Sequence, residues 1–180
     1  NGIPRGWIAK MKGAIAQNVP TFNTHRMVQD YMSMAYIPAS ERYLALGQDG
    51  ARRAKELAHW LDAVRGNWDA IRIVSLESDD RDGLPVAMRV TVTARLQLGA
   101  LRPDDVEVQI YHGTVDAQDQ ISNAQIEPMT LSERADDGTC TYQGSFHSDL
   151  TGLHGYALRV LPYHPDLGNV HATGLVHWSH

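Results

Sequence analysis

The stretch Val106-Glu107-Val108-Gln109-Ile110-Tyr111 decides the fold class of the second half of this 180-residue chain. Val106, Val108 and Ile110 alternate with the other three residues, so one face of an extended segment is uniformly apolar. A period of two is typical of a β-strand that packs one face on a core. The stretch therefore predicts a strand, whose partners must lie elsewhere in the sequence.

Six further segments have strand character and surround this one. They are residues 71–74, 86–94, 125–131, 139–146, 156–161 and 174–178. Turn-forming runs interrupt the series at Asp82-Gly83, Arg102-Pro103-Asp104-Asp105, Asp136-Asp137-Gly138 and His164-Pro165-Asp166. About seven short strands with such breaks predict an antiparallel β-sandwich of immunoglobulin-like type. The Cys…Trp…Cys pattern of true immunoglobulin domains is absent from the sequence.

Before Trp68 the apolar residues recur at helical spacing instead. Trp7, Ile8, Met11 and Ile15 form one stripe of a short helix, which Pro20 closes. Asn23 or Thr24 can cap a second helix, because side-chain oxygens accept hydrogen bonds from the free N–H groups of a first turn. That helix should run from His25 to about Ala35, with Met27, Val28, Tyr31, Met32 and Ala35 on its buried face, and end at the break that Pro38 imposes.

A third helical stretch opens at Ser40 and Glu41. Gly47 and Gly50 weaken it near its start, so we expect a kink or two shorter helices there. Beyond Ala51 a second apolar stripe follows, made of Ala54, Leu57, Ala58, Leu61 and Val64, and Gly66-Asn67 ends the helix. The predicted fold class is therefore α+β, with a helical segment over residues 1–67 and the antiparallel sandwich over residues 68–180.

Composition narrows the range of functions. The net charge of -5 gives no general attraction to nucleic acid, and no apolar run reaches the roughly 20 residues that a membrane helix needs. Cys140 is the only cysteine, which excludes an internal disulfide framework and suits a reducing cytoplasm. The chain begins Asn1-Gly2-Ile3-Pro4, without Met or a signal peptide, so we interpret it as a fragment rather than a processed mature protein.

Three stretches resemble the α-glucan phosphorylases of bacteria and archaea, which are pyridoxal-phosphate glycosyltransferases. The first is residues 1–12, similar to a run that follows the catalytic core. The second is residues 22–31 with Tyr36-Ile37-Pro38-Ala39, similar to the helix that ends the two-lobed glycosyltransferase fold. The third is residues 98–108 with residues 155–167, similar to the β-domain of one long bacterial branch. The matches occur in the expected order along the chain.

The resemblance implies that the catalytic residues lie outside this chain. The family forms a Schiff base between pyridoxal phosphate and a lysine in a Gly-rich stretch, and no such stretch occurs here. Lys10, Lys12 and Lys55 are the only lysines, and each lies in an amphipathic helical pattern, whereas a Schiff-base lysine needs a desolvated setting. We therefore expect no catalytic, cofactor-binding or metal-binding residue in this chain, which alone should be inactive.

Other clusters of chemically active residues have plainer explanations. Nine histidines raise the question of a metal site, with His164, His171, His177, His180, Asp149 and Asp166 as the candidate ligands. The spacing of His177 and His180 is close to that of zinc ligands, but the pair lies at the end of the chain, so surface and loop histidines are favoured. The acidic pairs Asp79-Asp80, Asp104-Asp105 and Asp136-Asp137 could suggest glycoside hydrolysis, but all fall in predicted turns.

Two further patterns remain. Ser145, His147, Ser148 and Asp149 are clustered, but neighbours on a strand point to opposite faces and no G-x-S-x-G motif is present. Aromatic residues of a sandwich can act as sugar platforms, although most pack in the core. The available rings are Trp68, Tyr111, Tyr142, Tyr156, Tyr163 and Trp178.

The methionines Met11, Met27, Met32 and Met34 form an apolar stripe that needs a cover. In the whole enzyme that cover would be the missing catalytic lobes. In the isolated chain we expect the third helix, the sandwich or a second copy of the chain.

The sequence thus predicts the non-catalytic C-terminal part of a cytoplasmic α-glucan phosphorylase. The parent would transfer glucosyl units from α-1,4-glucan to phosphate and release glucose 1-phosphate. The alternatives are a carbohydrate-binding or structural sandwich module without activity, and a self-contained hydrolase. The missing N-terminal catalytic lobes are the predicted partner. Glucan and a homo-oligomer stay open as further partners, whereas nucleic acid and membrane are not expected.

Overall fold

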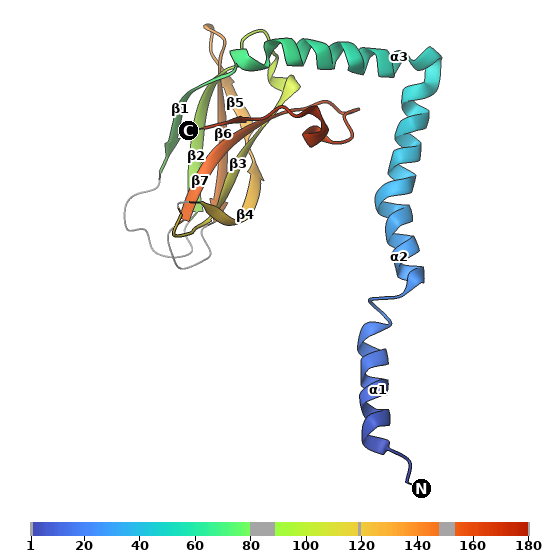
Figure 1. Ribbon diagram of the computed structural model, residues 1–180. Coiled ribbons are helices and arrows are strands. Elements are labelled where there is room, and N and C mark those ends of the chain that lie inside the picture. The colour runs from blue at the N-terminus through green and yellow to red at the C-terminus, as the bar shows by residue number, and fades with distance from the viewer. Residues whose placement is uncertain (1, 80–88, 119, 148–153, 180) are drawn as a thin grey trace. The chain divides into compact units, whose positions relative to one another are not determined.

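The computed structural model describes residues 2–79, 89–118, 120–147 and 154–179, which form two compact units. Unit 1 is Asn1–Ala54 and unit 2 is Lys55–His180. Helices make up unit 1, and antiparallel sheets dominate unit 2 (Figure 1). The predicted α+β fold class is confirmed. The boundary that the sequence predicts between residues 67 and 68 separates the catalytic region of the parent protein from its sandwich domain, so it stays a prediction.

Unit 1 contains α1 (Arg5–Asn18), α2 (Thr24–Tyr31), the π-helix η1 (Met32–Tyr36) and the first part of α3 (Ile37–Asn67). Asn23 caps α2, because its side chain accepts a hydrogen bond from the backbone N–H of Arg26 at 2.8 Å. The expected break at Pro38 is wrong: α2, η1 and α3 follow one another directly. Pro38 is the second residue of α3 and directly follows the π turn η1, whose wider hydrogen-bond spacing changes the backbone ladder just before the residue that lacks an N–H.

Helix α3 contains the kink that the glycine pair predicts. Its backbone leaves the helical region from Gln48 to Ala51, and Asp49, Gly50 and Ala51 have φ angles of 52°, 66° and 59°. A left-handed conformation costs a glycine almost nothing but strains an alanine, so Gly50 is the residue best suited to this turn. After the kink, α3 continues and ends at Asn67, as Gly66-Asn67 predicts.

Unit 2 contains two four-stranded sheets in which every strand pair is antiparallel. The first sheet has the order β1-β2-β6-β5 and the second has the order β4-β3-β7-β8. The strands of the first are β1 (Arg72–Ser78), β2 (Arg89–Gln97), β6 (Thr139–His147) and β5 (Thr130–Arg134). Those of the second are β4 (Ile121–Pro128), β3 (Val106–Val115), β7 (His154–Pro162) and β8 (His177–Trp178). Consecutive strands therefore pair within one sheet (β1 with β2, β3 with β4, β5 with β6 and β7 with β8), and the chain changes sheet between these pairs.

Two of the predicted strands differ from the structure. The single strand expected over residues 125–131 is wrong, because Met129 separates β4 from β5 and the two lie in different sheets. The strand expected over residues 174–178 is shorter, because Gly174 takes a left-handed conformation (φ 72°) after the short helix η4 (Val170–Thr173). Residues 86–88 of another predicted strand lie outside the described residues.

The core lies between the two sheets and includes the end of α3. Alternate residues of β2, β3, β6 and β7 point into it, among them Val92, Leu96, Val108, Ile110, Cys140, Phe146, Leu158 and Val160. Val64, Trp68 and Ile71 join the same cluster and are at most 5% exposed. The helix end is thus part of the core of unit 2.

A hydrogen bond also ties α3 to the start of β3. The indole N–H of Trp60 donates to Asp105 Oδ1 at 2.9 Å, and Asp105 belongs to the 3-10 turn η3 (Pro103–Asp105). Asp105 Oδ2 accepts from the backbone N–H of Arg102 at 2.8 Å. The ring of Trp60 also lies 4.9 Å from the ring of His164. Burial tends to raise the pKa of Asp105, but the hydrogen bonds from Arg102 and Trp60 outweigh it and hold the pKa below its ordinary value.

The Asp105 contact makes the stability of unit 2 depend on pH. We expect Asp105→Asn to lower the free energy of unfolding by about 1–3 kcal/mol at neutral pH, because a charged acceptor is lost. Since the folded pKa lies below the ordinary 3.8, this contribution is complete above that value and is lost as the pH falls through the folded pKa.

Chemical denaturation at a series of pH values from neutral to about pH 2 measures the free energy of unfolding of the unchanged chain and of Asp105→Asn. The difference between the two should shrink as the pH falls. Asp104→Asn is the control, because Asp104 is exposed and next in sequence. An undiminished difference in acid, or an equal loss in the control, would contradict this account.

Gly144 on β6 leaves room for Met129. A Cβ at Gly144 would lie 2.9 Å from Met129 Cγ and 3.0 Å from Ile110 Cδ1. Met129 is 7% exposed, and its N–H donates to Val108 O at 2.8 Å. The residue that links the sheets is thus held on both sides.

We expect Gly144→Ala to destabilise unit 2 by about 1–3 kcal/mol through overpacking. Gly66→Ala is the matched control, because no atom lies within 4 Å of the added Cβ. Thermal and urea denaturation measure both variants. The packing argument fails if the Gly144 variant is as stable as the unchanged chain.

Candidate functional site

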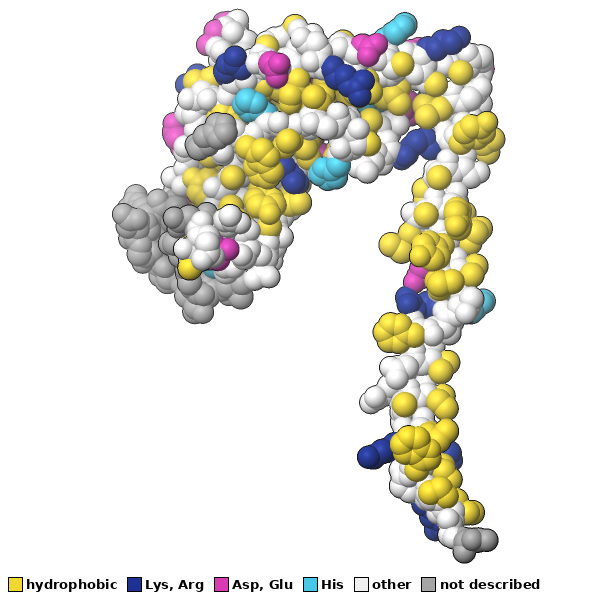
Figure 2. Space-filling model, in the orientation of Figure 1, with side chains coloured by type: hydrophobic (Ala, Val, Ile, Leu, Met, Phe, Trp, Pro, Cys, Tyr) yellow, Lys and Arg dark blue, Asp and Glu magenta, His cyan; other side chains and the backbone are white. Residues whose placement is uncertain are grey.

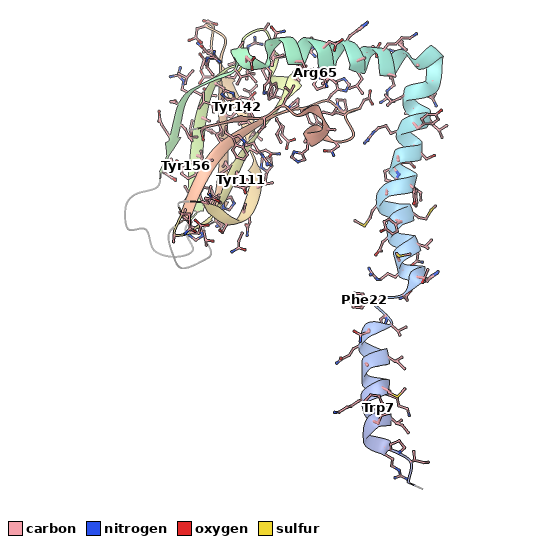
Figure 3. The ribbon with its side chains drawn as sticks, in the orientation of Figure 1. Trp7, Phe22, Arg65, Tyr111, Tyr142 and Tyr156 are labelled. Atoms are coloured by element: carbon pink, nitrogen blue, oxygen red, sulfur yellow. The ribbon has the colours of Figure 1, made fainter. Side chains whose placement is uncertain are left out.

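The helices of unit 1 carry an exposed apolar surface, which we call the helix surface. None of the described residues up to His59 is buried. Figure 2 shows apolar side chains along the whole length of these helices, and Figure 3 labels Trp7 on α1 and Phe22 in the connection between α1 and α2. The helix surface consists of Trp7, Met11, Ile15, Phe22, Met27, Val28, Tyr31, Met32, Met34, Tyr36, Tyr43 and Leu44.

Exposure of this extent is unusual for a helix of a globular protein. Trp7 is 64% exposed, Phe22 78% and Met34 79%. Burial of such side chains drives most helix packing, and extended apolar patches generally mark interaction sites. Unit 1 therefore carries an apolar surface that its own helices leave exposed.

The expected burial of the second helix and of the methionine stripe is wrong for this unit. Met27, Val28 and Tyr31 of α2 are 47–55% exposed, although the sequence predicts them on a buried face. The stripe methionines are 44–79% exposed, so the first part of α3 does not cover them. The apolar periodicity was identified correctly, but the surface that should cover it is not supplied by unit 1.

The lysines and histidines occupy ordinary positions. Lys10, Lys12 and Lys55 are all exposed. The Nδ1 atom of His164 accepts a hydrogen bond from the backbone N–H of Asp166 at 3.1 Å, and His171 is exposed. Among the described residues, no three His, Cys, Asp or Glu side chains gather as a metal site. Asp149 and His180 lie outside those residues.

In the acidic pairs, Asp79 and Asp137 accept hydrogen bonds from backbone N–H groups. Asp137 Oδ1 accepts from the backbone N–H of Thr139 at 2.9 Å, and this contact holds the pKa of Asp137 below its ordinary value. Asp79 accepts in the same way from the backbone N–H of Thr91 at 2.6 Å. Asp105 is the exception, because its partner Trp60 is 45 residues away and no local pattern reveals it.

The remaining clusters do not assemble a triad in the described part of the chain. The Oγ of Ser145 accepts a hydrogen bond from Arg89, and His147 is exposed. Ser148 and Asp149 fall outside the described residues.

The six predicted aromatic residues divide into core and surface groups. Trp68 and Tyr142 are buried in the core, where burial raises the pKa of the Tyr142 hydroxyl. Tyr163 is 47% exposed. Tyr156 is half-buried, with its ring 5.8 Å from that of Phe146. Tyr111 and Trp178 are also half-buried and contact each other edge to face at 5.3 Å.

Comparison with known proteins identifies the chain. Residues 68–180 match the family model described as "Glycogen phosphorylase C-terminal domain". The chain belongs to this family. It is 31% identical over 176 residues to a glycogen phosphorylase of Mycobacterium tuberculosis, and 29% identical over 178 residues to a maltodextrin phosphorylase of Thermococcus litoralis. These alignments cover 97% and 96% of this chain but 20% of each relative.

The chain thus spans about a fifth of the length of these phosphorylases, and the predicted resemblance to the C-terminal region of α-glucan phosphorylases is confirmed. The helix surface lies outside the segment matched by the family model but inside the aligned part of the relatives, which covers nearly the whole chain. Within the described residues, no helix is long and apolar enough to cross a membrane.

The helix surface can be altered without loss of stability in the chain alone. We expect Trp7→Ser, Met11→Ser and Ile15→Ser together to leave the unfolding of unit 2 unchanged, because these side chains are 47–64% exposed. Binding of a hydrophobic dye should fall in the same variant. Lys10→Ser with Lys12→Ser on the same helix is the control and should change neither measurement. Cooperative destabilisation of unit 2 by the triple change would refute the assignment of these residues to a free surface.

Proposed function

We propose that this chain is the non-catalytic C-terminal part of an α-glucan phosphorylase and docks on the catalytic lobes through the helix surface. The whole enzyme would transfer glucosyl units from α-1,4-glucan to phosphate, releasing glucose 1-phosphate in the cytoplasm. The observation that carries the proposal is the uncovered helix surface. About four-fifths of each relative's length lies outside the aligned part, which is an ample source of polypeptide to cover the helix surface.

The lysines support the expected division of labour. They are exposed and do not fit the desolvated setting that a Schiff-base lysine requires. Pyridoxal phosphate, which the resemblance implies for the parent, would therefore be held by residues outside this chain. Residues 1–67 would be the closing helices of a two-lobed glycosyltransferase fold, and residues 68–180 the appended sandwich.

We further propose that the sandwich is of immunoglobulin-like type. The strand order β1-β2-β6-β5 corresponds to strands A, B, E and D of that fold. The order β3-β7-β8 corresponds to strands C, F and G, and β4 adds an edge strand beside C. A rigid module of this kind would support assembly of the enzyme or the positioning of glucan. The alternative is a carbohydrate-binding or structural module that acts without a catalytic partner.

The activity test compares the full-length parent with this chain. We expect the parent to form glucose 1-phosphate from maltoheptaose and phosphate, and the 180-residue chain to form none. The triple change Trp7→Ser, Met11→Ser and Ile15→Ser should lower both the melting temperature and the activity of the parent, because each apolar side chain contributes about 1.5–3 kcal/mol when fully buried.

The double change Lys10→Ser with Lys12→Ser is again the control. Turnover by the 180-residue chain would refute the non-catalytic role. Unchanged melting and activity in the triple variant of the parent would refute the docking role of the helix surface.

A further inference from the structure

The outer face of the second sheet carries an ordered polar and aromatic cluster. Val108 and Ile110 of β3 point into the core, so Gln109 and Tyr111 point to the opposite face. Strand register places Gln109 opposite Arg159 of β7, and Arg159 opposite Trp178 of β8. Figure 3 labels Tyr111 on this sheet. Residues from three strands therefore meet on one surface that the core does not use.

Arg159 is the centre of this cluster. Its guanidinium carbon lies 5.6 Å from the ring centre of Tyr111 and 5.5 Å from that of Trp178. The Nε atom of Arg159 donates to Gln109 Oε1 at 3.0 Å, and a second guanidinium nitrogen donates to the same oxygen. Gln109 is 9% exposed, and its Nε2 donates to Glu107 Oε1 at 2.7 Å. The guanidinium plane is thus fixed before any ligand arrives.

A cavity of about 210 Å³ adjoins the cluster. Its walls include Arg159, Leu161, His171, Leu175, Val176 and Trp178. Leu161 is 2% exposed and forms a firm apolar floor, whereas His171 is exposed at the rim. The cavity therefore combines an aromatic ring, apolar walls and two side chains that can form hydrogen bonds. Binding sites for small organic molecules typically have this composition.

Two guanidinium nitrogens of Arg159 donate to Gln109, and the guanidinium keeps further N–H groups that can donate to a ligand with hydroxyl oxygens. Arg159 forms no ion pair with a carboxylate among the described residues, but its charge is stabilised by two aromatic faces and the Gln109 oxygen. A sugar ring has an apolar C–H face that can lie on an aromatic ring, and hydroxyl groups at its edge that can accept from a guanidinium or an imidazole. The two relatives compared above are named for glycogen and maltodextrin, which are both α-glucans.

We propose that this cavity holds one glucose residue of an α-glucan, with Trp178 as the stacking ring and Arg159 and His171 as hydrogen-bonding residues. The inference rests on the proposed function, and it assigns a glucan-binding site to the second sheet of unit 2. The catalytic lobes need not take part, so the 180-residue chain should bind glucan by itself. Binding here would raise the local concentration of glucan around the enzyme, as linked binding sites generally do.

Calorimetric titration of maltoheptaose into the 180-residue chain tests the site. We expect Trp178→Leu to raise the Kd about tenfold and His171→Ala about threefold, as the loss of a stacking ring and of one hydrogen bond would give. Tyr163→Leu is the matched control, because Tyr163 is an exposed ring that does not line the cavity. It should change the Kd less than about twofold.

His171→Ala keeps the test valid if Trp178→Leu unfolds β8, because His171 is exposed. Absence of maltoheptaose binding by the unchanged chain, or binding that neither variant weakens, would overturn the proposal. Equal affinity for cellohexaose would overturn the α-glucan class. Binding of inorganic phosphate in place of maltoheptaose would assign the cavity to an anion and also overturn it. Formation of glucose 1-phosphate by the parent tests the proposed function separately, so either idea can fail alone.

Discussion

The burial of Val64, Trp68 and Ile71 between the two sheets is the contact on which the structure of unit 2 depends. These residues are buried where α3 is followed by β1, so they hold the end of the helix and the start of the first sheet together. The hydrogen bond from Trp60 to Asp105 secures the same junction one turn earlier in the helix. Loss of this junction would uncover one end of the core, because the two sheets alone do not close it.

Local sequence signals predicted the elements well where one short-range interaction decides the backbone. Asn23 caps α2 because its acceptor lies three residues from the N–H that it binds. Gly50 marks the kink of α3 because few other residues tolerate its φ angle. The alternation of residues 106–111 predicted β3 because burial on one face imposes a period of two. In each case the determining partners are close in sequence or act through a single residue.

The sequence-based predictions that were wrong also have physical causes. The strand-like stretch over residues 125–131 has no break signal strong enough to divide it, but its two halves lie in different sheets, and only pairing with distant strands decides this. Pro38 is tolerated because a π turn precedes it, and no composition rule indicates that turn. The cluster around Arg159 escaped prediction because Gln109 is 50 residues away in sequence. The periodicity of unit 1 was predicted correctly, but periodicity cannot say whether the covering surface belongs to the same chain.

The passage from β4 to β5 through Met129 has a consequence for how this domain can evolve. One residue joins two strands that lie in opposite layers, and its side chain is seated against Gly144. An inserted residue at this passage would shift the register of β5 against β6 and unseat the methionine. Length changes should therefore accumulate in other connections, while this crossing keeps a constant number of residues through descent.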